Sequence, residues 1–254
     1  MSTVLISLGS FGADEVRRHG QHWFAALAAD AGADGVEVRG ELLRDPAHEL
    51  PALAALARER GLGIVYSSPE PLWSDDGRLD GAALRRGLEA AAALGAPRLK
   101  MSIGGFTAGD AAGLAELAQA LAATPIELLI ENDQTESAGT LAPLRAFFVQ
   151  ARSAGLSLPM TFDMGNWHWT GEDPLQAAQA LAGQVGYVHC KGVLRQPHQW
   201  VAVPLAASAA PWRAVLRALP TDMPRAIEYP LAGSDLLAVT RAQVALVRSV
   251  ERAA

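Results

Sequence analysis

The chain has 254 residues, of which 50% are hydrophobic and 19% are charged, and its formal charge at pH 7 is -6. This composition can build a large buried core, and it excludes a mainly disordered chain. The acidic balance, with no lysine- or arginine-rich run, argues against nucleic acid or an anionic membrane as a partner and favours a small molecule.

The compartment is inferred from what the sequence lacks. Its one cysteine, Cys190, excludes an internal disulfide. The start MSTVLISLGS has neither the basic residues nor the long apolar run of a secretion signal. No window approaches the roughly 20 apolar residues of a membrane span. We therefore expect a cytoplasmic protein without a membrane partner, and the sequence leaves open whether it forms a homo-oligomer.

Short aliphatic or β-branched runs recur along the chain, each followed by a stretch with helical spacing. The runs that we interpret as strands are 3–8, 35–39, 61–66, 98–102, 126–131, 159–163, 185–189 and 225–228. The helical candidates between them include 21–32, 50–61, 81–95, 140–155 and 211–220. Several of these end in the glycine that a helix C-cap prefers. The alternation predicts an α/β fold, a single-domain (β/α)8 TIM barrel over residues 1–254.

The longer non-helical segments follow the predicted strands. They are 67–80, 102–110, 131–140, 163–174 and 191–209. In a TIM barrel these loops lie at the carboxyl ends of the strands and carry the functional residues. We therefore expect the active site in these segments and in the strand ends that lead into them.

The last four predicted strands each end on a residue that can bind a metal: Glu131, Asp163, His189 and Glu228. Taken singly, each has an ordinary explanation as a solvated strand end, a turn cap, a core histidine or an ion-pair partner. Their shared position predicts one metal site, because the strand ends of a barrel converge on one rim. Three carboxylates and one imidazole favour Mn²⁺, Mg²⁺ or Co²⁺ over a structural zinc ion.

Alternation along the seventh strand refines this prediction, because residues two apart face the same side. If His189 faces the barrel axis, Lys191 joins it at the rim. Cys190 then points outward, as a packed thiol that is neither a ligand nor a nucleophile.

The same alternation turns further charged residues toward the site. It places Lys100 inside the fourth strand, and Glu37 together with Arg39 on one face of the second. A buried cation needs carboxylate neighbours or an anionic ligand; the alternative is a solvated charge at the rim. The loop after the sixth strand places Asn166 and His168 above the metal site. His168 is either a proton shuttle, a substrate contact or an exposed loop histidine.

At these residues the chain resembles the xylose isomerase-like TIM barrel superfamily, also known as the sugar phosphate isomerase/epimerase family. The resemblance spans all eight βα units and rests on the segments GVEVR, IENDQT, FDMGN, YVHCKG, VPLAASAAPWRAVLRAL and AIEYP. It implies that Glu131, Asp163, His189 and Glu228 bind one divalent ion, and that the reaction passes through an enolate or enediolate. It also implies that Glu131 and Glu228 transfer protons on opposite faces of the substrate.

Members of this superfamily include ketose 3-epimerases, hydroxypyruvate isomerase, dehydratases and a 3-oxo-isoapionate decarboxylase. Epimerases of this type usually carry a histidine after the fourth strand, where this chain has Lys100 and Ser102. The cations Lys100, Lys191, Arg195 and Arg39 suggest a substrate with a carboxylate or phosphate end. We therefore predict a metal-dependent isomerase or epimerase of a small keto-sugar or keto-sugar acid. The alternative is a lyase, either a decarboxylase of the 3-oxo-isoapionate type or a dehydratase.

The predicted catalytic residues are Glu131, Glu228 and Lys100. The predicted substrate contacts are Glu37, Arg39, Asn166, His168, Lys191 and Arg195. Two other classes remain as hypotheses. The DNA-repair endonuclease branch of the fold is disfavoured by the acidic charge and the few histidines near strand ends. A Schiff-base aldolase would use Lys100 and need no metal.

Overall fold

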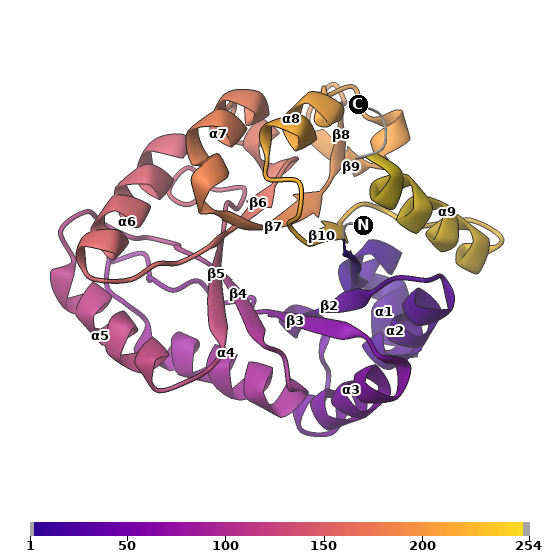
Figure 1. The fold of residues 1–254 in the computed structure, drawn as a ribbon, viewed down its shortest axis with the longest axis horizontal. Helices are drawn as coiled ribbons and strands as arrows, with labels where there is room; N and C mark the ends of the chain where they lie inside the picture. The colour runs from indigo at the N-terminus through magenta and orange to yellow at the C-terminus, as the bar shows by residue number, and fades with distance from the viewer. Residues whose placement is uncertain (1–2, 251–254) are drawn as a thin grey trace.

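The computed structural model describes residues 3–250, so the outermost residues of the predicted domain lie outside the described range. Eight parallel strands form a closed barrel in the order β1-β10-β7-β6-β5-β4-β3-β2. Figure 1 shows these strands at the centre of the molecule with the helices around them. The predicted (β/α)8 TIM barrel is therefore confirmed.

The barrel strands agree with the predicted runs to within two residues at each end. They are β1 (Val4–Ser7), β2 (Gly35–Arg39), β3 (Gly63–Ser67), β4 (Arg98–Ser102), β5 (Glu127–Glu131), β6 (Met160–Asp163), β7 (Val185–Cys190) and β10 (Arg225–Ile227). The last strand ends one residue earlier than predicted, so Glu228 lies just beyond it.

The helices occupy the intervals between the strands, and α9 follows the last strand. They are α1 (Ala13–His19), α2 (Gln21–Asp30), α3 (Pro46–Arg60), α4 (Gly81–Leu94), α5 (Ala111–Ala122), α6 (Leu141–Ser153), α7 (Pro174–Leu181), α8 (Trp212–Ala218) and α9 (Leu236–Ser249). As predicted, α3 and α4 end at glycines, and Gly61 and Gly95 adopt the left-handed conformation that favours this residue. Among the described residues, no helix is both long and apolar enough to span a membrane.

The segment after β7 is more ordered than predicted. We expected a non-helical loop over 191–209, but it contains an antiparallel hairpin of β8 (Gly192–Arg195) and β9 (Trp200–Val203). A side chain at Gly192 would lie 2.5 Å from the carbonyl oxygen of Val203, so the close pairing at the base of the hairpin requires glycine. The flanking aliphatic and aromatic residues are typical of a hairpin, a signal that the βα alternation does not use.

The core has an outer part between strands and helices and a smaller part inside the barrel. The inner cluster consists of Leu5, Val65, Leu129, Tyr187 and Ala226. Glu131, His189 and Glu228 each follow a member of this cluster by two positions. Alternate residues of a strand face the same side. These three side chains therefore point into the barrel, as the residues of the inner cluster do. Cys190 packs in the outer core instead, and burial raises the pKa of its thiol to about 12.

Candidate metal centre

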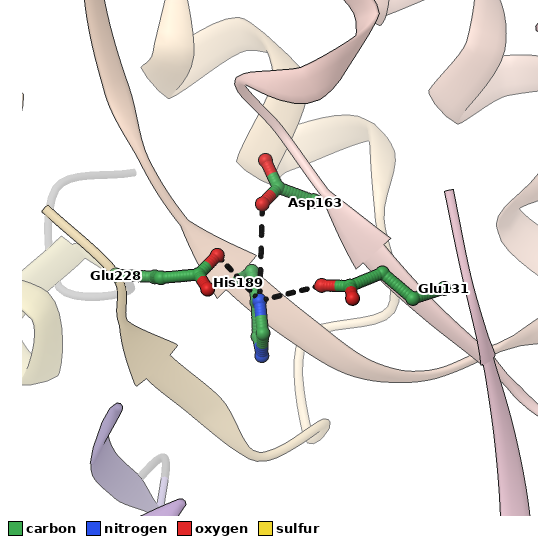
Figure 2. A group of neighbouring side chains, drawn as sticks. All are labelled: Glu131, Asp163, His189 and Glu228. Atoms are coloured by element: carbon green, nitrogen blue, oxygen red, sulfur yellow. Dashed lines mark hydrogen bonds and ion pairs between the residues drawn. The ribbon is translucent and has the colours of Figure 1, made fainter. Parts of the chain in front are cut away.

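Glu131, Asp163, His189 and Glu228 converge at the carboxyl ends of β5, β6, β7 and β10, and each offers one ligand atom within 4.8 Å of the others. In Figure 2 the three carboxylates approach the Nδ1 atom of His189 from three directions. The oxygens of Glu228, Glu131 and Asp163 lie 2.7, 3.0 and 3.8 Å from this nitrogen. The structure thus brings together all four predicted ligands.

The spacing and the donor types both fit one divalent ion. Two atoms bound to one ion at up to about 2.6 Å each cannot be more than about 5.2 Å apart, and the four ligand atoms satisfy this limit. One imidazole and three carboxylates form a donor set suited to an ion such as Mn²⁺, Mg²⁺ or Co²⁺. Asp163 and His189 are fully buried, whereas Glu131 and Glu228 are partly exposed. A small molecule could therefore reach the site on the sides where the two glutamates lie.

The other nitrogen of His189 is held by Glu37. The Nε2–H of His189 donates to Oε2 of Glu37 over 2.7 Å, and Glu37 is fully buried. Burial alone would raise the pKa of Glu37, but His189 and Lys100 lower it, which keeps the carboxylate ionised. Such a contact fixes the ring and the tautomer of a metal-binding histidine. We predicted Glu37 as a substrate contact, but its location behind His189 favours a positioning role.

Lys100 connects Glu37 to the candidate ligand Glu131. Its Nζ lies 2.7 Å from Oε2 of Glu131 and 3.3 Å from Oε1 of Glu37, and its side chain is 1% exposed. Burial alone would lower the pKa of Lys100, but the two glutamates raise it. In turn, Lys100 and His189 overcome the effect of burial and lower the pKa of Glu131 to about 2. Lys100 therefore has the carboxylate partners that a buried cation requires. Because its amine is buried, this geometry favours a role in which Lys100 orients Glu131 over one in which it contacts the substrate itself.

Asp163 is held by its own turn and by Asn132. Its Oδ1 accepts hydrogen bonds from the backbone N–H groups of Gly165 and Asn166, which leaves Oδ2 toward His189. The side chain of Asn132 bonds both the N–H and the C=O of Asp163, at 2.8 and 3.0 Å. Sequence reasoning missed Asn132, whose only signal is its place directly after a predicted ligand.

Lys191 lies against the same turn. Its Nζ is 2.7 Å from Oδ2 of Asp163, 3.0 Å from Oε2 of Glu228 and 3.0 Å from Oδ1 of Asn166. A Cβ at Gly165 would lie 2.7 Å from the Lys191 side chain, so glycine leaves room for this approach. Burial alone would lower the pKa of Lys191, but Asp163 and Glu228 raise it. The predicted position of Lys191 at the rim beside His189 agrees with these contacts.

Arg39 holds the other oxygen of Glu228. Its Nη1 lies 2.6 Å from Oε1 of Glu228, and its Nη2 lies 2.8 Å from the half-exposed Glu41. Arg39 and the two lysines thus supply three cations to four carboxylates, those of Glu37 and of the three acidic ligands. Because Arg39 also pairs with Glu41, these three cations together with a divalent ion and a neutral histidine would balance the five carboxylates, so a metal-loaded site would be close to neutral.

Of the remaining predicted contacts, Asn166 lies at the site, whereas His168 and Arg195 lie apart from it. The side-chain oxygen of Asn166 accepts from Gln134 and Lys191, and Asn166 is buried. The ring of His168 packs on Trp200 at 4.8 Å, and the guanidinium of Arg195 lies 5.3 Å from the same indole. Burial lowers the pKa of His168. Within residues 3–250, no hydrogen bond or ion pair joins His168 or Arg195 to the four ligands.

Two cavities adjoin the cluster. The Glu228 cavity, of about 390 Å³, reaches Glu228 and Lys191. The Glu131 cavity, of about 460 Å³, reaches Glu131. Arg39 and Glu41 border both. Each glutamate therefore faces a space of a size that binds small molecules.

We expect Glu37→Gln to weaken Mn²⁺ binding by roughly 10- to 100-fold, the usual effect of losing a carboxylate behind a metal-bound histidine. Glutamine keeps the size of the side chain and one acceptor oxygen, so the fold should persist. Calorimetric titration measures the affinity. Glu127→Gln, an exposed change at the start of β5, is the matched control. Unchanged affinity in a folded Glu37→Gln protein would contradict the positioning role.

The fold and the donor set define a TIM barrel with a candidate mononuclear metal centre at the carboxyl ends of its strands. The chain belongs to the xylose isomerase-like TIM barrel family, whose model matches residues 25–248, as the resemblance predicted. None of the curated protein sequences matches the chain.

Several solved structures share this fold. A xylose isomerase-like TIM barrel/4-hydroxyphenylpyruvate dioxygenase fusion protein has a TM-score of 0.74 and 12% identity; the match covers 99% of this chain and 43% of the fusion protein. An L-ribulose 3-epimerase has a TM-score of 0.73 and 20% identity, covering 99% and 96% of the two chains. A probable 3-DHS dehydratase from Bacillus anthracis has a TM-score of 0.67 and 15% identity, covering 98% and 99%. At such identities the likeness shows the fold alone.

Proposed function

We propose that this protein is a divalent-metal-dependent isomerase or epimerase that acts on a small keto-sugar or keto-sugar acid. One observation carries the proposal. Glu131 and Glu228 flank His189 from opposite sides (Figure 2), and each also borders a cavity. The likeness to an L-ribulose 3-epimerase is consistent with this function. By donor type the ion would be Mn²⁺, Mg²⁺ or Co²⁺.

The two glutamates have matched surroundings. Glu131 directs Oε1 to His189 and Oε2 to Lys100, whereas Glu228 directs Oε2 to His189 and Oε1 to Arg39. Each carboxylate is therefore oriented by a cation on its second oxygen. Their positions suit proton removal from one face of a substrate and proton return to the other.

The metal would supply the electrophile. A divalent ion held by the four residues would polarise the substrate carbonyl and stabilise the enediolate. The protein's own part is to orient the glutamates and keep them ionised. Burial raises the pKa of Glu228, but His189 and Lys191 bring it well below its usual range. Lys100 does the same for Glu131.

A metal-dependent lyase is the second candidate function. The three cations around the carboxylates favour a substrate with an acidic group, and a β-keto acid could lose that group as CO₂ to give the same type of enolate. The likeness to a probable 3-DHS dehydratase also permits elimination of water. Both lyase reactions, decarboxylation and dehydration, would use the same candidate metal centre.

Assays of the purified protein with Mn²⁺ in D₂O test the proposal. The substrates are neutral keto-sugars and keto-sugar acids, and the readouts are deuterium at the carbon beside the carbonyl, new isomers and released CO₂. We expect deuterium and isomers with at least one substrate, lost in chelator and restored by Mn²⁺. Release of CO₂ would instead support the lyase. Turnover that is unaffected by chelator would contradict both.

We expect no covalent trapping of a keto-sugar on Lys100 by borohydride. An imine requires an accessible, uncharged amine, whereas Nζ of Lys100 is buried between two carboxylates. The chain has only two lysines, Lys100 and Lys191, so mass spectrometry of peptides assigns any adduct. A substrate adduct on Lys100 would support the Schiff-base aldolase and overturn this role.

A further inference from the structure

The two cavities beside the metal centre differ in charge. The cations that line the Glu228 cavity are Arg17, Arg39 and Lys191, against the carboxylates of Glu41 and Glu228. In the Glu131 cavity Arg39 is the cation, and the carboxylates are those of Glu41, Glu70, Asp75, Glu131 and Asp133. An acidic group would therefore be favoured in the Glu228 cavity and repelled in the Glu131 cavity.

The Glu131 cavity is also rich in hydroxyl groups. They belong to Ser67, Ser68, Ser102, Thr135 and Ser137. Carboxylates accept hydrogen bonds, and hydroxyls both donate and accept them, so together they suit the hydroxyl groups of a sugar chain. The Glu228 cavity has two serines, Ser7 and Ser10, and its wall also carries apolar groups, among them those of Leu42, Tyr229 and Pro230.

Arg17 is the cation of the Glu228 cavity with the loosest attachment. Arg39 and Lys191 lie within 3.0 Å of ligand carboxylates. Arg17, on α1, has its ion pair with Asp14 at 3.5 Å, and both side chains are exposed. An exposed pair of this kind contributes little, so Arg17 can turn to a ligand at small cost.

On the basis of the proposed function, we propose that the substrate is a sugar acid that lies across the metal centre. Its carboxylate occupies the Glu228 cavity beside Arg17, and its hydroxylated chain occupies the Glu131 cavity. The reacting carbons then lie between Glu131 and Glu228. Arg17 determines the preference for an acid over a neutral sugar, and Asp75, one of the carboxylates of the Glu131 cavity, disfavours a second acidic group there.

Calorimetry on the Mn²⁺-loaded protein tests this orientation with three six-carbon probes: sorbitol has no acidic end, gluconate has one and glucarate has two. We expect gluconate to bind roughly tenfold more tightly than sorbitol, the effect of a hydrogen bond to a charged group. Glucarate should bind more weakly than gluconate, because its second carboxylate would enter the Glu131 cavity.

Single substitutions then assign the two ends. Arg17→Gln should remove most of the preference for gluconate and leave sorbitol unchanged. Arg18→Gln, the next residue on the same helix, is the matched control and should change neither. Asp75→Asn should strengthen glucarate binding roughly threefold without affecting gluconate, the scale of one exposed charge contact.

Three results would overturn the inference: equal binding of sorbitol and gluconate, a preference for gluconate that persists in Arg17→Gln, or tighter binding of glucarate than of gluconate. The second result would mean that the carboxylate binds elsewhere, for instance at the metal. Failure of the proposed function looks different. In that case the Arg17-dependent preference for gluconate survives, but no substrate exchanges deuterium.

Discussion

Replacing Glu131 or Glu228 by glutamine is expected to lower turnover by about 10²-fold or more, while the protein keeps its metal. Glutamine retains an oxygen ligand but cannot accept a proton as a base. Both variants should fold. In Glu131→Gln, Lys100 keeps its ion pair with Glu37, and in Glu228→Gln, Arg39 keeps its ion pair with Glu41. Steady-state kinetics and metal analysis on the same samples measure the two effects separately.

Glu127→Gln on β5 serves as the control and should match the wild type. If only one of the two glutamine variants is impaired, a single-base isomerase, decarboxylase or dehydratase is favoured over a two-base epimerase. If both bind metal and turn over at wild-type rates, the proton transfer belongs to other groups, with Lys100 and His168 as the next candidates.

Asp163→Asn is expected to remove metal-linked stability. An ion that binds only the folded state at 100 times its Kd adds about 2.7 kcal/mol to the free energy of unfolding. For a chain of this size that raises the Tm by roughly 5–10 °C. Asparagine would still accept the hydrogen bonds of Gly165 and Asn166 through its carbonyl oxygen, so its amide NH₂ group, which cannot bind a cation, would replace the oxygen Oδ2 that faces His189. Thermal unfolding with and without Mn²⁺ measures the difference.

The wild type should therefore show the rise in Tm with Mn²⁺ and lose it in chelator, whereas Asp163→Asn should show little rise. Glu127→Gln should behave as the wild type. An equal rise in Asp163→Asn would mean that Mn²⁺ stabilises the protein from another site.

The barrel and the clustering of the four candidate ligands could be predicted because both depend on local patterns. Strand runs alternate with helical stretches, Glu131 and Asp163 end their strands, and His189 is the last residue but one of β7. In a closed parallel barrel the strand ends must converge on one rim, so the prediction did not require knowing which strands pair with each other. Glu228 lies one residue past β10 and still joins the site.

The contacts behind the ligands could not be predicted in the same way. Alternation places Glu37 and Lys100 inside the barrel, but it does not show that Glu37 bonds His189, 152 residues away in sequence. Pairings at that separation depend on barrel register and on side-chain conformation. The same limit applies to Arg195, which follows β7 closely but packs on Trp200 across the hairpin.

An anomalous difference map from crystals grown with Mn²⁺ tests the central claim most directly. We predict one strong peak bound to Nδ1 of His189 and to an oxygen of each of Glu131, Asp163 and Glu228, at roughly 2.0–2.6 Å. A peak at another site, or none at the four residues when the ion is in excess, would contradict the metal centre and the function proposed from it.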